Sequence, residues 1–349
     1  MDNLPSISII IPTLNCRDTL KQCLESIVIQ EYPHEKIEFV IADGGSTDGT
    51  LELVSRFQNV NALLSVKLIE NSLITGEAGK AIASKAARNE IFAFIDSDNI
   101  LPHKSWLREM IAPFEDHEIA ASEPLYYTYR KEDGLITRYC ALLGMNDPIC
   151  LFAGNYDRYC LLNNNWTGRP HKKEDKGSYL KLQFDKEWLP TIGANGFLIR
   201  KSVLEKCSVG EYLFDIDIIY DLICTIYKTD VIRFAKVKTG IVHVFSGNTR
   251  SFIRKQKRRI KDYLYFNKLG ARHYPWKTMG NIKLLRFIFF SVTVAPLFLQ
   301  SIRGYIKKPD RAWFYHPVAC VITLWVYGLE VTFRKLTNQK LERKGWNIR

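Results

Sequence analysis

Two closely spaced carboxylates follow one of the most apolar stretches of the chain. Asp96 and Asp98 stand at positions i and i+2, with Ser97 between them, directly after the run Phe92–Ile95. Carboxylate oxygens are preferred ligands of Mg²⁺ or Mn²⁺, which commonly bridge to phosphate oxygens. A solvated turn is the alternative for so short a pattern. The place directly after a buried strand favours the metal site.

A second acidic turn, Asp43-Gly-Gly-Ser-Thr-Asp48, follows another apolar run. Its two glycines let the backbone approach a ligand. A carboxylate at a strand end can also accept a hydrogen bond from a nucleobase or from a ribose hydroxyl. The alternative is a turn in which Thr47 or Asp48 caps the next helix. Both interpretations can hold, with Asp43 on a ligand and Asp48 on the backbone.

Four further residues have two interpretations each. Lys80 follows two glycines whose spacing does not fit a P-loop, so it is either a point charge for a diphosphate or an exposed lysine at a helix start. Asp215 and Asp217 can supply the general base that a sugar hydroxyl needs, or they can stabilise the first turn of a helix over Ile218–Tyr227. His243 is either a metal ligand or a hydrogen-bonded core histidine.

Alternating strands and helices must position these side chains. Strands are expected over Ser6–Pro12, Glu38–Ala42, Ser65–Ile69 and Ile91–Ile95, and helices over Thr13–Gln30, Leu51–Phe57 and Gly79–Asn89. This alternation predicts an α/β fold with a parallel sheet, in which ligands bind outside the carboxyl ends of the strands. Both acidic turns lie at such ends. From Glu123 to Leu189 the pattern loosens, and we interpret that stretch as loops and short elements.

The ordered series of motifs resembles the family 2 glycosyltransferases of the GT-A fold. The resemblance extends over residues 5–245 and rests on Ile9–Thr13, Asp43–Thr50, Phe94–Asp98, Thr191–Arg200, Phe214–Asp217 and Ile241–His243. It implies a Rossmann-like mixed sheet flanked by helices. It also implies transfer of a sugar from a nucleotide-sugar donor, with inversion at the anomeric carbon.

The resemblance also implies roles for individual residues. Donor-binding residues are expected at Pro12, Thr13, Asp43, Lys80, Asp96 and Ser97. An acceptor loop is expected at Gly193, Ala194, Asn195 and Gly196. Metal ligands are expected at Asp96, Asp98 and His243. Asp217 matches the catalytic base of a Glu-Asp pair, but Ile216 replaces the usual Glu, so Asp215 is a second candidate. The Arg-x-x-x-Trp stretch of processive synthases is absent, which favours transfer of one sugar per encounter.

Composition and charge place the chain among folded proteins with an unusual tail. The 349 residues are 46% hydrophobic and 25% charged, which excludes disordered and collagen-like classes. The net charge of +12 is uneven, because residues 244–349 carry 22 basic and 4 acidic side chains whereas the rest is net acidic. Eight scattered cysteines are typical of thiols in a reducing compartment. The first residues lack signal-peptide features, which predicts a catalytic domain on the cytoplasmic side.

The tail combines a basic helix with two apolar segments. Arg250–Lys261 carries seven basic residues at helical spacing, which is typical of a membrane-surface helix or of a nucleic-acid patch. Leu284–Ile302 and Ala312–Phe333 would form helices of about 28 and 33 Å, close to one bilayer core. They favour lipid over nucleic acid as the partner. The basic connector Arg303–Arg311 opposes translocation, so a re-entrant or interfacial hairpin, with its first segment kinked at Pro296, is favoured over two spans. Two core helices of a soluble protein are the remaining alternative.

The sequence therefore predicts a GT-A catalytic domain over residues 1–245 and a membrane-associated helical segment over residues 246–349. Its expected partners are a nucleotide-sugar donor, a glycan or lipid-linked acceptor, Mg²⁺ or Mn²⁺, and membrane lipids along residues 250–335. One alternative is a polyprenyl-phosphate sugar synthase, whose phosphate acceptor needs no base. Another is a membrane-anchored nucleotide-sugar binding protein without catalysis.

Overall fold

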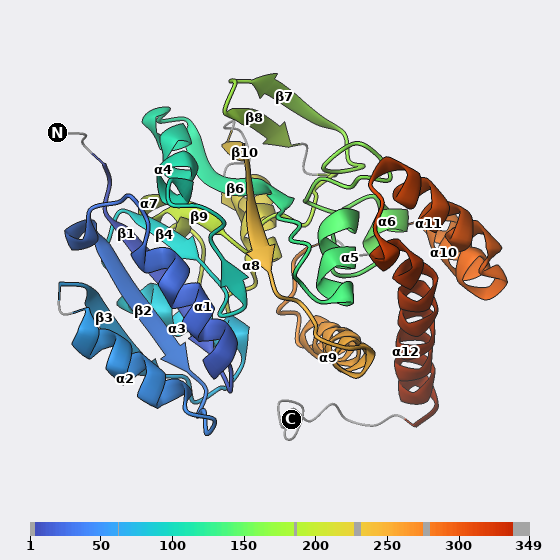
Figure 1. Ribbon diagram of the computed structural model, residues 1–349, viewed down its shortest axis with the longest axis horizontal. Coiled ribbons are helices and arrows are strands. Elements are labelled where there is room, and N and C mark those ends of the chain that lie inside the picture. The colour runs from blue at the N-terminus through green and yellow to red at the C-terminus, as the bar shows by residue number, and fades with distance from the viewer. Residues whose placement is uncertain (1–3, 62, 185–186, 227–231, 275–279, 338–349) are drawn as a thin grey trace. The chain divides into compact units, whose positions relative to one another are not determined.

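The computed structural model describes residues 4–61, 63–184, 187–226, 232–274 and 280–337 (Figure 1). The chain forms two compact units. Unit 1 comprises Met1–Thr128 and Pro170–His243, and unit 2 comprises Tyr129–Arg169 and Val244–Arg349. The predicted domain boundary at residue 245 lies close to the last junction of the units, between His243 and Val244. Residues 129–169, however, fold with the C-terminal segment, because their apolar side chains pack against those of residues 245–322.

Unit 1 is built on one mixed sheet with the strand order β3-β2-β1-β4-β9-β6-β10-β8-β7, and β5 pairs with β10 at its end. The strands are β1 (Ile7–Thr13), β2 (Ile37–Asp43), β3 (Ser65–Glu70), β4 (Ile91–Phe94), β5 (Asn99–Ile100), β6 (Ile119–Tyr127), β7 (His171–Asp175), β8 (Tyr179–Phe184), β9 (Phe197–Arg200) and β10 (Arg233–His243). Strands β1 to β4 are parallel, and β9 runs antiparallel to both of its neighbours. The predicted α/β class with a mixed sheet is therefore confirmed.

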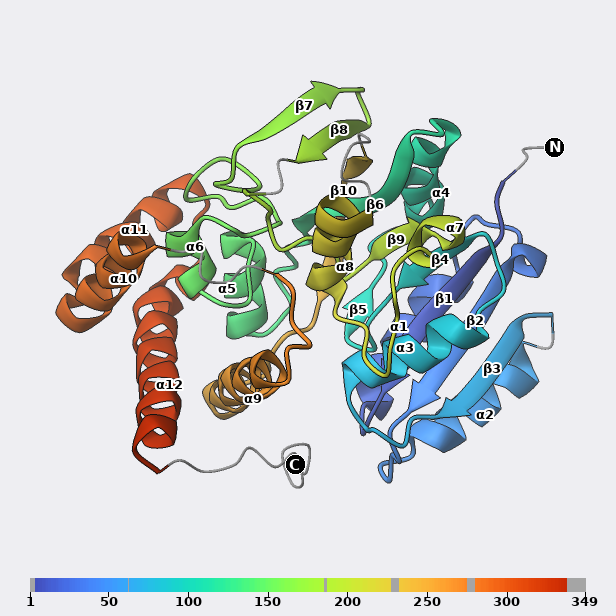
Figure 2. The same cartoon turned by 180° about the vertical axis from the view of Figure 1, so that it is seen from behind.

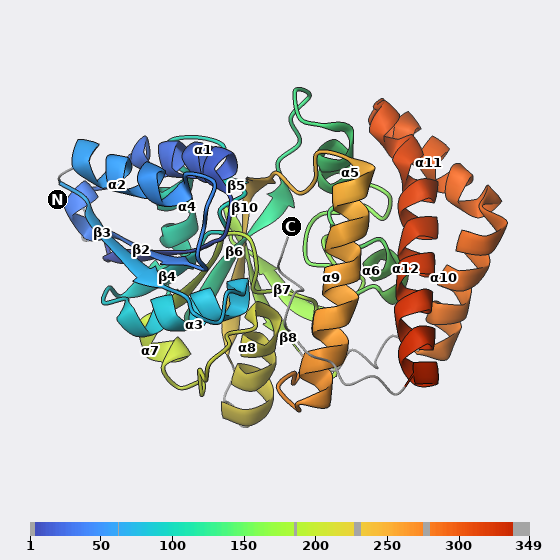
Figure 3. The same ribbon diagram turned by 90° about the horizontal axis from the view of Figure 1, so that it is seen from below.

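Helices cover both faces of this sheet. Figure 3 shows α1 and α2 on one face and α3, α7 and α8 on the other. The helices are α1 (Arg17–Val28), α2 (Thr50–Val60), α3 (Gly76–Ala86), α4 (Trp106–Ile111), α7 (Lys201–Leu204) and α8 (Asp215–Asp221), with short turns η1 (His34–Lys36) and η2 (Ala112–Glu115) and a π-helical stretch η3 (Leu222–Ile226). All four predicted strands and all three predicted N-terminal helices form, within a few residues at each end.

The first strands form where expected because they are short, β-branched runs that are buried on both faces. Every residue of β2 is buried, and in β1 only Pro12 is partly exposed. The register pairs Thr13 with Asp43, so the ends of β1 and β2 coincide. Chain connections leave the sheet at this end, and the predicted acidic turns lie here.

Unit 2 is helical. Its helices are α5 (Leu135–Leu143), α6 (Ile149–Ala153), α9 (Thr249–Lys268), α10 (Asn281–Thr293), α11 (Ala295–Lys307) and α12 (Tyr315–Thr337), with the 3₁₀ turn η5 (Arg311–Phe314) before α12 (Figure 2). The apolar core is formed by α5 and residues 156–162 packed against Phe252, Trp313 and Ala319. Helix α9 begins at an Asn248 capping box, in which Asn248 and Ser251 each satisfy the other's backbone N–H.

The segment Leu284–Ile302 is not one straight helix, and it bends next to Pro296, where a kink is expected. The chain breaks at Val294, whose φ of +59° is in the left-handed region, and α10 and α11 meet at 90°. Pro296, in the first turn of α11, lacks the N–H that would continue α10. In the part of the chain that the structure describes, the stretch Arg311–Arg334 is long and apolar enough to cross a membrane, and the bent pair would count as a second segment only if taken as one span.

Candidate active site

The carboxylate of Asp43, at the end of β2, accepts hydrogen bonds from the turn that follows and from β1. Its Oδ1 accepts from the Thr13 hydroxyl at 2.9 Å and from the Ser46 hydroxyl at 2.6 Å, while Oδ2 accepts from the Gly45 and Ser46 N–H groups at 2.9 and 2.8 Å. The side chain is buried. Asp43 and Thr13 therefore hold the turn between β2 and α2, and their predicted contacts with a nucleotide sugar stay predictions.

The remainder of this turn is fixed by its own side chains. Asp48 Oδ1 accepts from the N–H of Thr50 at 3.1 Å, and its Oδ2 accepts from the N–H of Arg17. This confirms that Asp48 binds backbone N–H groups, at the starts of α1 and α2. The N-cap of α2 is Gly49, however, and not Thr47 or Asp48 as expected. Gly44 lies against the backbone of Ile74, where a Cβ would come within 2.9 Å of the carbonyl oxygen. The turn is thus rigid before any ligand binds.

The Asp96-Ser97-Asp98 turn follows β4 as expected. The Asn99 amide oxygen accepts from the Asp96 N–H at 3.0 Å, and the Ser97 side chain is hydrogen bonded to the Cys16 thiol. Strand β5 pairs Asn99 with His243 of β10. This pairing brings His243 Nε2 to 3.4 Å from Asp98 Oδ2. Two of the three predicted metal ligands thus come together from residues 145 positions apart in the chain.

Lys80 does not lie at the surface. It is the fifth residue of α3, its side chain is 6% exposed, and its Nζ lies 2.9 Å from Asp96 Oδ1 and 2.7 Å from Asp215 Oδ2. The interpretation as an exposed helix-start lysine is therefore wrong. Since its charge is shared by two carboxylates, the predicted contact with a diphosphate stays a prediction.

The same arrangement changes the pKa values of Asp215 and Lys80. Burial raises the pKa of Asp215 to about 7, and the Lys80 ammonium opposes that rise. Burial lowers the pKa of Lys80, but the carboxylates of Asp215 and Asp96 outweigh it and hold the pKa above its usual value. Asp215 Oδ1 is buried and accepts no hydrogen bond from the described part of the chain. Asp215 can therefore take up a proton near neutral pH while Lys80 stays charged.

The predicted acceptor loop lies against Asp215. Gly193 has a φ of +134°, and a Cβ there would come within 2.2 Å of the Asp215 carbonyl oxygen, so only glycine fits. Gly196 has a φ of +86° and donates its N–H to the Phe94 carbonyl at 3.0 Å. Ala194, between them in this loop, is partly exposed. The loop is thus joined both to α8 and to the end of β4.

A pair of buried amides joins this loop to the acidic turn. Asn99 donates from Nδ2 to Asn195 Oδ1 at 3.0 Å, and Asn195 donates from Nδ2 to the Tyr127 hydroxyl at 3.1 Å. The Tyr127 ring lies 5.6 Å from the His243 ring, centroid to centroid. Through Asn99 and Tyr127, which the sequence analysis did not single out, these contacts connect three predicted site segments: the Asp96–Asp98 turn, the Gly193–Gly196 loop and His243.

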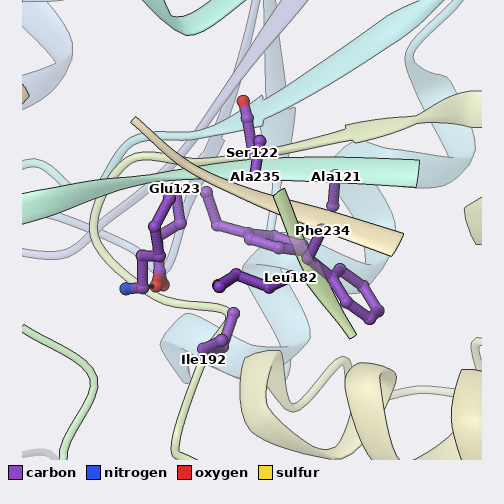
Figure 4. A pocket seen from close by; sticks show the side chains of 9 residues that line it. Ala121, Ser122, Glu123, Leu182, Ile192, Phe234 and Ala235 are labelled. Carbon is purple, nitrogen blue, oxygen red and sulfur yellow. Dashed lines mark hydrogen bonds and ion pairs between the residues drawn. The ribbon is translucent and has the colours of Figure 1, made fainter. Parts of the chain in front are cut away.

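A buried ion pair lies behind the loop. Lys236 of β10 and Glu123 of β6 form a salt bridge in which each side chain is only 1% exposed, and Glu123 Oε1 also accepts from the Gly193 N–H at 2.9 Å. A small pocket beside the pair is lined by Ala121, Ser122, Glu123, Leu182, Ile192, Phe197, Phe234, Ala235 and Lys236 (Figure 4). None of the predicted site residues lines it. Glu123 is the one charged residue of β6, but β10 carries Arg233, Lys236 and Lys238, so the sequence does not single out Lys236 as its partner.

The structure thus brings most of the predicted residues to one end of the sheet. Asp96, Lys80 and Asp215 form one cluster, and Asp98 with His243 forms a second. Among the residues that the structure describes, no three His, Cys, Asp or Glu side chains are grouped closely enough to hold a metal by themselves. Asp217 is buried in the first turn of α8, and Pro12 contacts α3, where a Cβ on Gly79 would come within 2.9 Å of it.

Comparison with known proteins gives consistent matches. Residues 8–208 match the family described as Glycosyl transferase family 2. The glycosyltransferase AglE of Haloferax volcanii is 33% identical over 109 residues, which cover 31% of this chain and 35% of that protein. The poly(ribitol-phosphate) beta-N-acetylglucosaminyltransferase TarS of Staphylococcus aureus is 32% identical over 159 residues, 45% of this chain and 25% of that protein. The chain thus spans about a quarter to a third of the length of these relatives.

The fold also matches a solved structure. The mannosyltransferase PcManGT from Pyrobaculum calidifontis, in complex with GDP-Man and Mn²⁺, superposes with a TM-score of 0.54 at 16% identity. The match covers 97% of this chain and 89% of that one. At this identity the likeness establishes the fold alone. The ligands of the present chain must be inferred from its own residues.

Proposed function

This chain belongs to glycosyl transferase family 2, and on that premise we propose that it moves a single sugar from a nucleotide-sugar donor to an acceptor hydroxyl at a membrane, with inversion at the anomeric carbon. The observation that carries the proposal is the carboxylate of Asp215. One of its oxygens contacts Lys80, the other is buried without a hydrogen bond from the described residues, and its pKa is raised to about 7 by burial. A carboxylate of this kind suits a general base.

The proposed reaction is a single displacement. Asp215 takes the proton of the acceptor hydroxyl while the acceptor oxygen forms a bond to the anomeric carbon. The bond from that carbon to the diphosphate breaks, and its electron pair leaves with the nucleoside diphosphate. Because Gly193 lies against the backbone carbonyl of Asp215, the loop Gly193–Gly196 adjoins the residue that carries the base, and we assign it the positioning of the acceptor hydroxyl. Asp217 is the other candidate base, as the family resemblance implies.

The donor set of Asp98 and His243 fits a divalent cation. A carboxylate oxygen and an imidazole nitrogen 3.4 Å apart can serve as two ligands of Mn²⁺ or Mg²⁺, with Asp96 as the third predicted ligand and further positions for diphosphate oxygens. When bound, the cation would neutralise charge on the leaving diphosphate. The proposed donor-binding residues remain Pro12, Thr13, Asp43, Lys80, Asp96 and Ser97.

We also propose that unit 2 associates with a membrane through residues 250–335, and that the catalytic residues face the cytoplasm. The support is chemical. The apolar helices α10, α11 and α12 expose many large side chains, and α9 exposes several cations. An acceptor carried by a lipid or by a membrane-bound glycan would then be presented close to the enzyme. A lipid-phosphate acceptor is the alternative substrate class, and it would need no base.

Binding of the donor tests the proposal most directly. We expect calorimetry to show that one class of nucleoside diphosphate binds in an Mn²⁺-dependent manner. The Asp98→Asn variant should weaken that binding by at least about tenfold, the lower end of what loss of a supporting partner of a metal ligand costs. Asp18→Asn, an exposed carboxylate on α1, is the control and should bind as the wild type does. No binding of any nucleotide would refute the donor site, and equal binding by Asp98→Asn would remove Asp98 from the metal site.

The pH dependence of transfer gives an independent prediction. A base must be unprotonated, so kcat/KM should rise with pH and level off above about 7, the pKa of Asp215. Because the Lys80 ammonium lowers this pKa, the Lys80→Met variant should move the acidic limb to higher pH. Lys85→Met, on the exposed side of α3, should leave it in place. If the acidic limb of the pH profile stays in place in Lys80→Met, the catalytic base is not Asp215 of this cluster.

A further inference from the structure

The C-terminal helices of unit 2 pack with small residues inside and large apolar residues outside. Besides the large side chains of Phe287, Leu297, Tyr315 and His316, the buried positions of α10, α11 and α12 include Ser291, Ser301, Gly304, Ala319, Cys320 and Thr323. The exposed positions include Ile282, Leu285, Phe289, Val292, Phe298, Leu299, Ile302, Ile306, Val318, Trp325 and Leu329. Gly304 is in close contact with the Trp313 ring, to which a Cβ would approach within 2.4 Å. Water-soluble helices bury their large apolar side chains, whereas helices in lipid pack through small ones.

Both outer ends of the bent pair are held by one short segment. At the start of α10, Lys283 Nζ donates to the Ala153 carbonyl at 3.0 Å. At the end of α11, Lys307 Nζ donates to the carbonyls of Leu161 and Leu162 at 2.7 and 3.0 Å. Residues 153 and 161 are only eight positions apart in unit 2. A pair that crossed a bilayer would have its two ends on opposite faces, about 30 Å apart. Eight residues approach that distance only when fully extended, so these contacts favour both ends on the same face.

The connector after α11 is held in the same way. Asp310 Oδ2 accepts a hydrogen bond from the Tyr129 hydroxyl and lies 3.1 Å from Arg138 Nε. Tyr129 and Arg138 belong to the part of unit 2 that precedes all of the apolar helices. If the connector lay across a membrane, these residues would have to lie there too, although no candidate span separates them from the N-terminus among the described residues.

The size of the bent pair matches one leaflet. Each arm has 13 residues, about 20 Å of helix. Two such arms at 90° reach about 14 Å from the line that joins their outer ends, which is about half of a 30 Å hydrocarbon core. The exposed apolar residues Val292, Phe298 and Leu299 lie near the bend, at the point farthest from the anchored ends. The bend is therefore the part that can enter lipid.

Helix α12 is long enough to span but packs along a charged helix. Helices α9 and α12 lie side by side (Figure 3). The Tyr315 and Phe252 rings lie 5.6 Å apart, and Lys257 Nζ lies 3.4 Å from Glu330 Oε1. The outer face of α9 exposes Arg250, Arg254, Lys257 and Arg258. A spanning α12 would carry these cations into hydrocarbon, which is unfavourable for each of them. At the level of the headgroups the same cations attract anionic lipid.

We infer that α10 and α11 enter a single leaflet of an anionic bilayer at their bend and return to the same face, while α9 and α12 lie at the headgroups, so that no described helix of unit 2 crosses the membrane. This inference rests on the membrane association proposed above. It names the membrane partner as one leaflet of anionic phospholipid. The exposed cations of α9 face its phosphates and the apolar bend faces its acyl chains.

Site-directed labelling tests the topology. Full-length Gly247→Cys and Pro309→Cys variants, which place a reporter before α9 and in the connector, are expressed and sealed membrane vesicles are prepared. The vesicles are treated with a membrane-impermeant maleimide, and labelling at each site is read by peptide mass spectrometry. Detergent-solubilised samples define complete labelling. We expect the two sites to be labelled to the same fraction in every vesicle preparation. Labelling of Pro309→Cys only where Gly247→Cys is protected would overturn the inference.

Flotation tests the leaflet contact with purified protein. Wild type should float with phosphatidylcholine vesicles that contain phosphatidylglycerol and less well without it. The Val292→Glu/Leu299→Glu variant should reduce flotation at least about tenfold, whereas Leu68→Glu, an exposed leucine on β3 of unit 1, should not. Flotation unchanged by the double variant would overturn insertion of the bend. Failure of the wild type to float at all would refute membrane association itself, and nucleotide binding reports separately on the catalytic proposal.

Discussion

Replacing Asp215 by Asn should lower kcat for sugar transfer by about 10²–10⁴-fold, the usual contribution of a general base. The amide has the shape of the carboxylate but cannot take the proton of the acceptor hydroxyl. Lys80 keeps its contact with Asp96 at 2.9 Å, so its buried charge retains a partner and the fold should survive. Binding of the donor should change little, because the loss is confined to the transfer step. Steady-state kinetics with calorimetry on the same samples measure both quantities.

The matched control is Asp217→Asn, two residues further along the first turn of α8. If Asp215 is the base, Asp217→Asn should retain a kcat well above that of Asp215→Asn. A larger loss in Asp217→Asn would transfer the role to Asp217, as the family resemblance implies. Full activity in both variants would show that the acceptor needs no deprotonation. It would then favour a lipid phosphate, which is already an anion, as the acceptor.

The first hundred residues were predictable because their signals are local. Strands β1, β2 and β4 are short apolar runs, and β2 and β4 end in polar turns that contain Asp43 and Asp96. The positions of Asp43, Asp96 and Asp98 at strand ends followed directly from that pattern. By contrast, β9 pairs in antiparallel direction with β4 and β6, which are distant in the sequence. The periodicity of apolar residues along the chain does not reveal which distant segments pair.

The contacts that define the site were less accessible to sequence reasoning. Lys80 and Asp215 are 135 residues apart, and their pairing depends on how α3 and α8 pack on one face of the sheet. Neither the sequence around Lys80 nor the sequence around Asp215 indicates that the two residues form a pair. The break at Val294 shows the same limit in unit 2. Composition predicted an apolar segment with a kink at Pro296, but a β-branched residue in the left-handed region arises from tertiary contacts.

The pair of Glu123 and Lys236 leads to the largest expected effect on stability. Both side chains are 1% exposed, so Lys236→Met leaves a carboxylate buried without its cation. Breaking such a pair costs about 3–5 kcal/mol of unfolding free energy. Because Glu123 also accepts from the Gly193 N–H, the same variant should raise the KM for the acceptor. Urea denaturation and acceptor kinetics measure the two effects.

Strand β10 provides the control two residues away. Lys238 pairs with Asp175 at 2.7 Å, but this pair is solvent-exposed, so Lys238→Met should cost less than about 1 kcal/mol. The double variant Glu123→Gln/Lys236→Met should recover most of the stability, because it removes both charges while the Gln carbonyl can still accept from Gly193. Equal losses in Lys236→Met and Lys238→Met would show that burial of the pair contributes nothing to the fold. A double variant that recovers stability but keeps the high KM would show that the acceptor loop depends on the carboxylate itself.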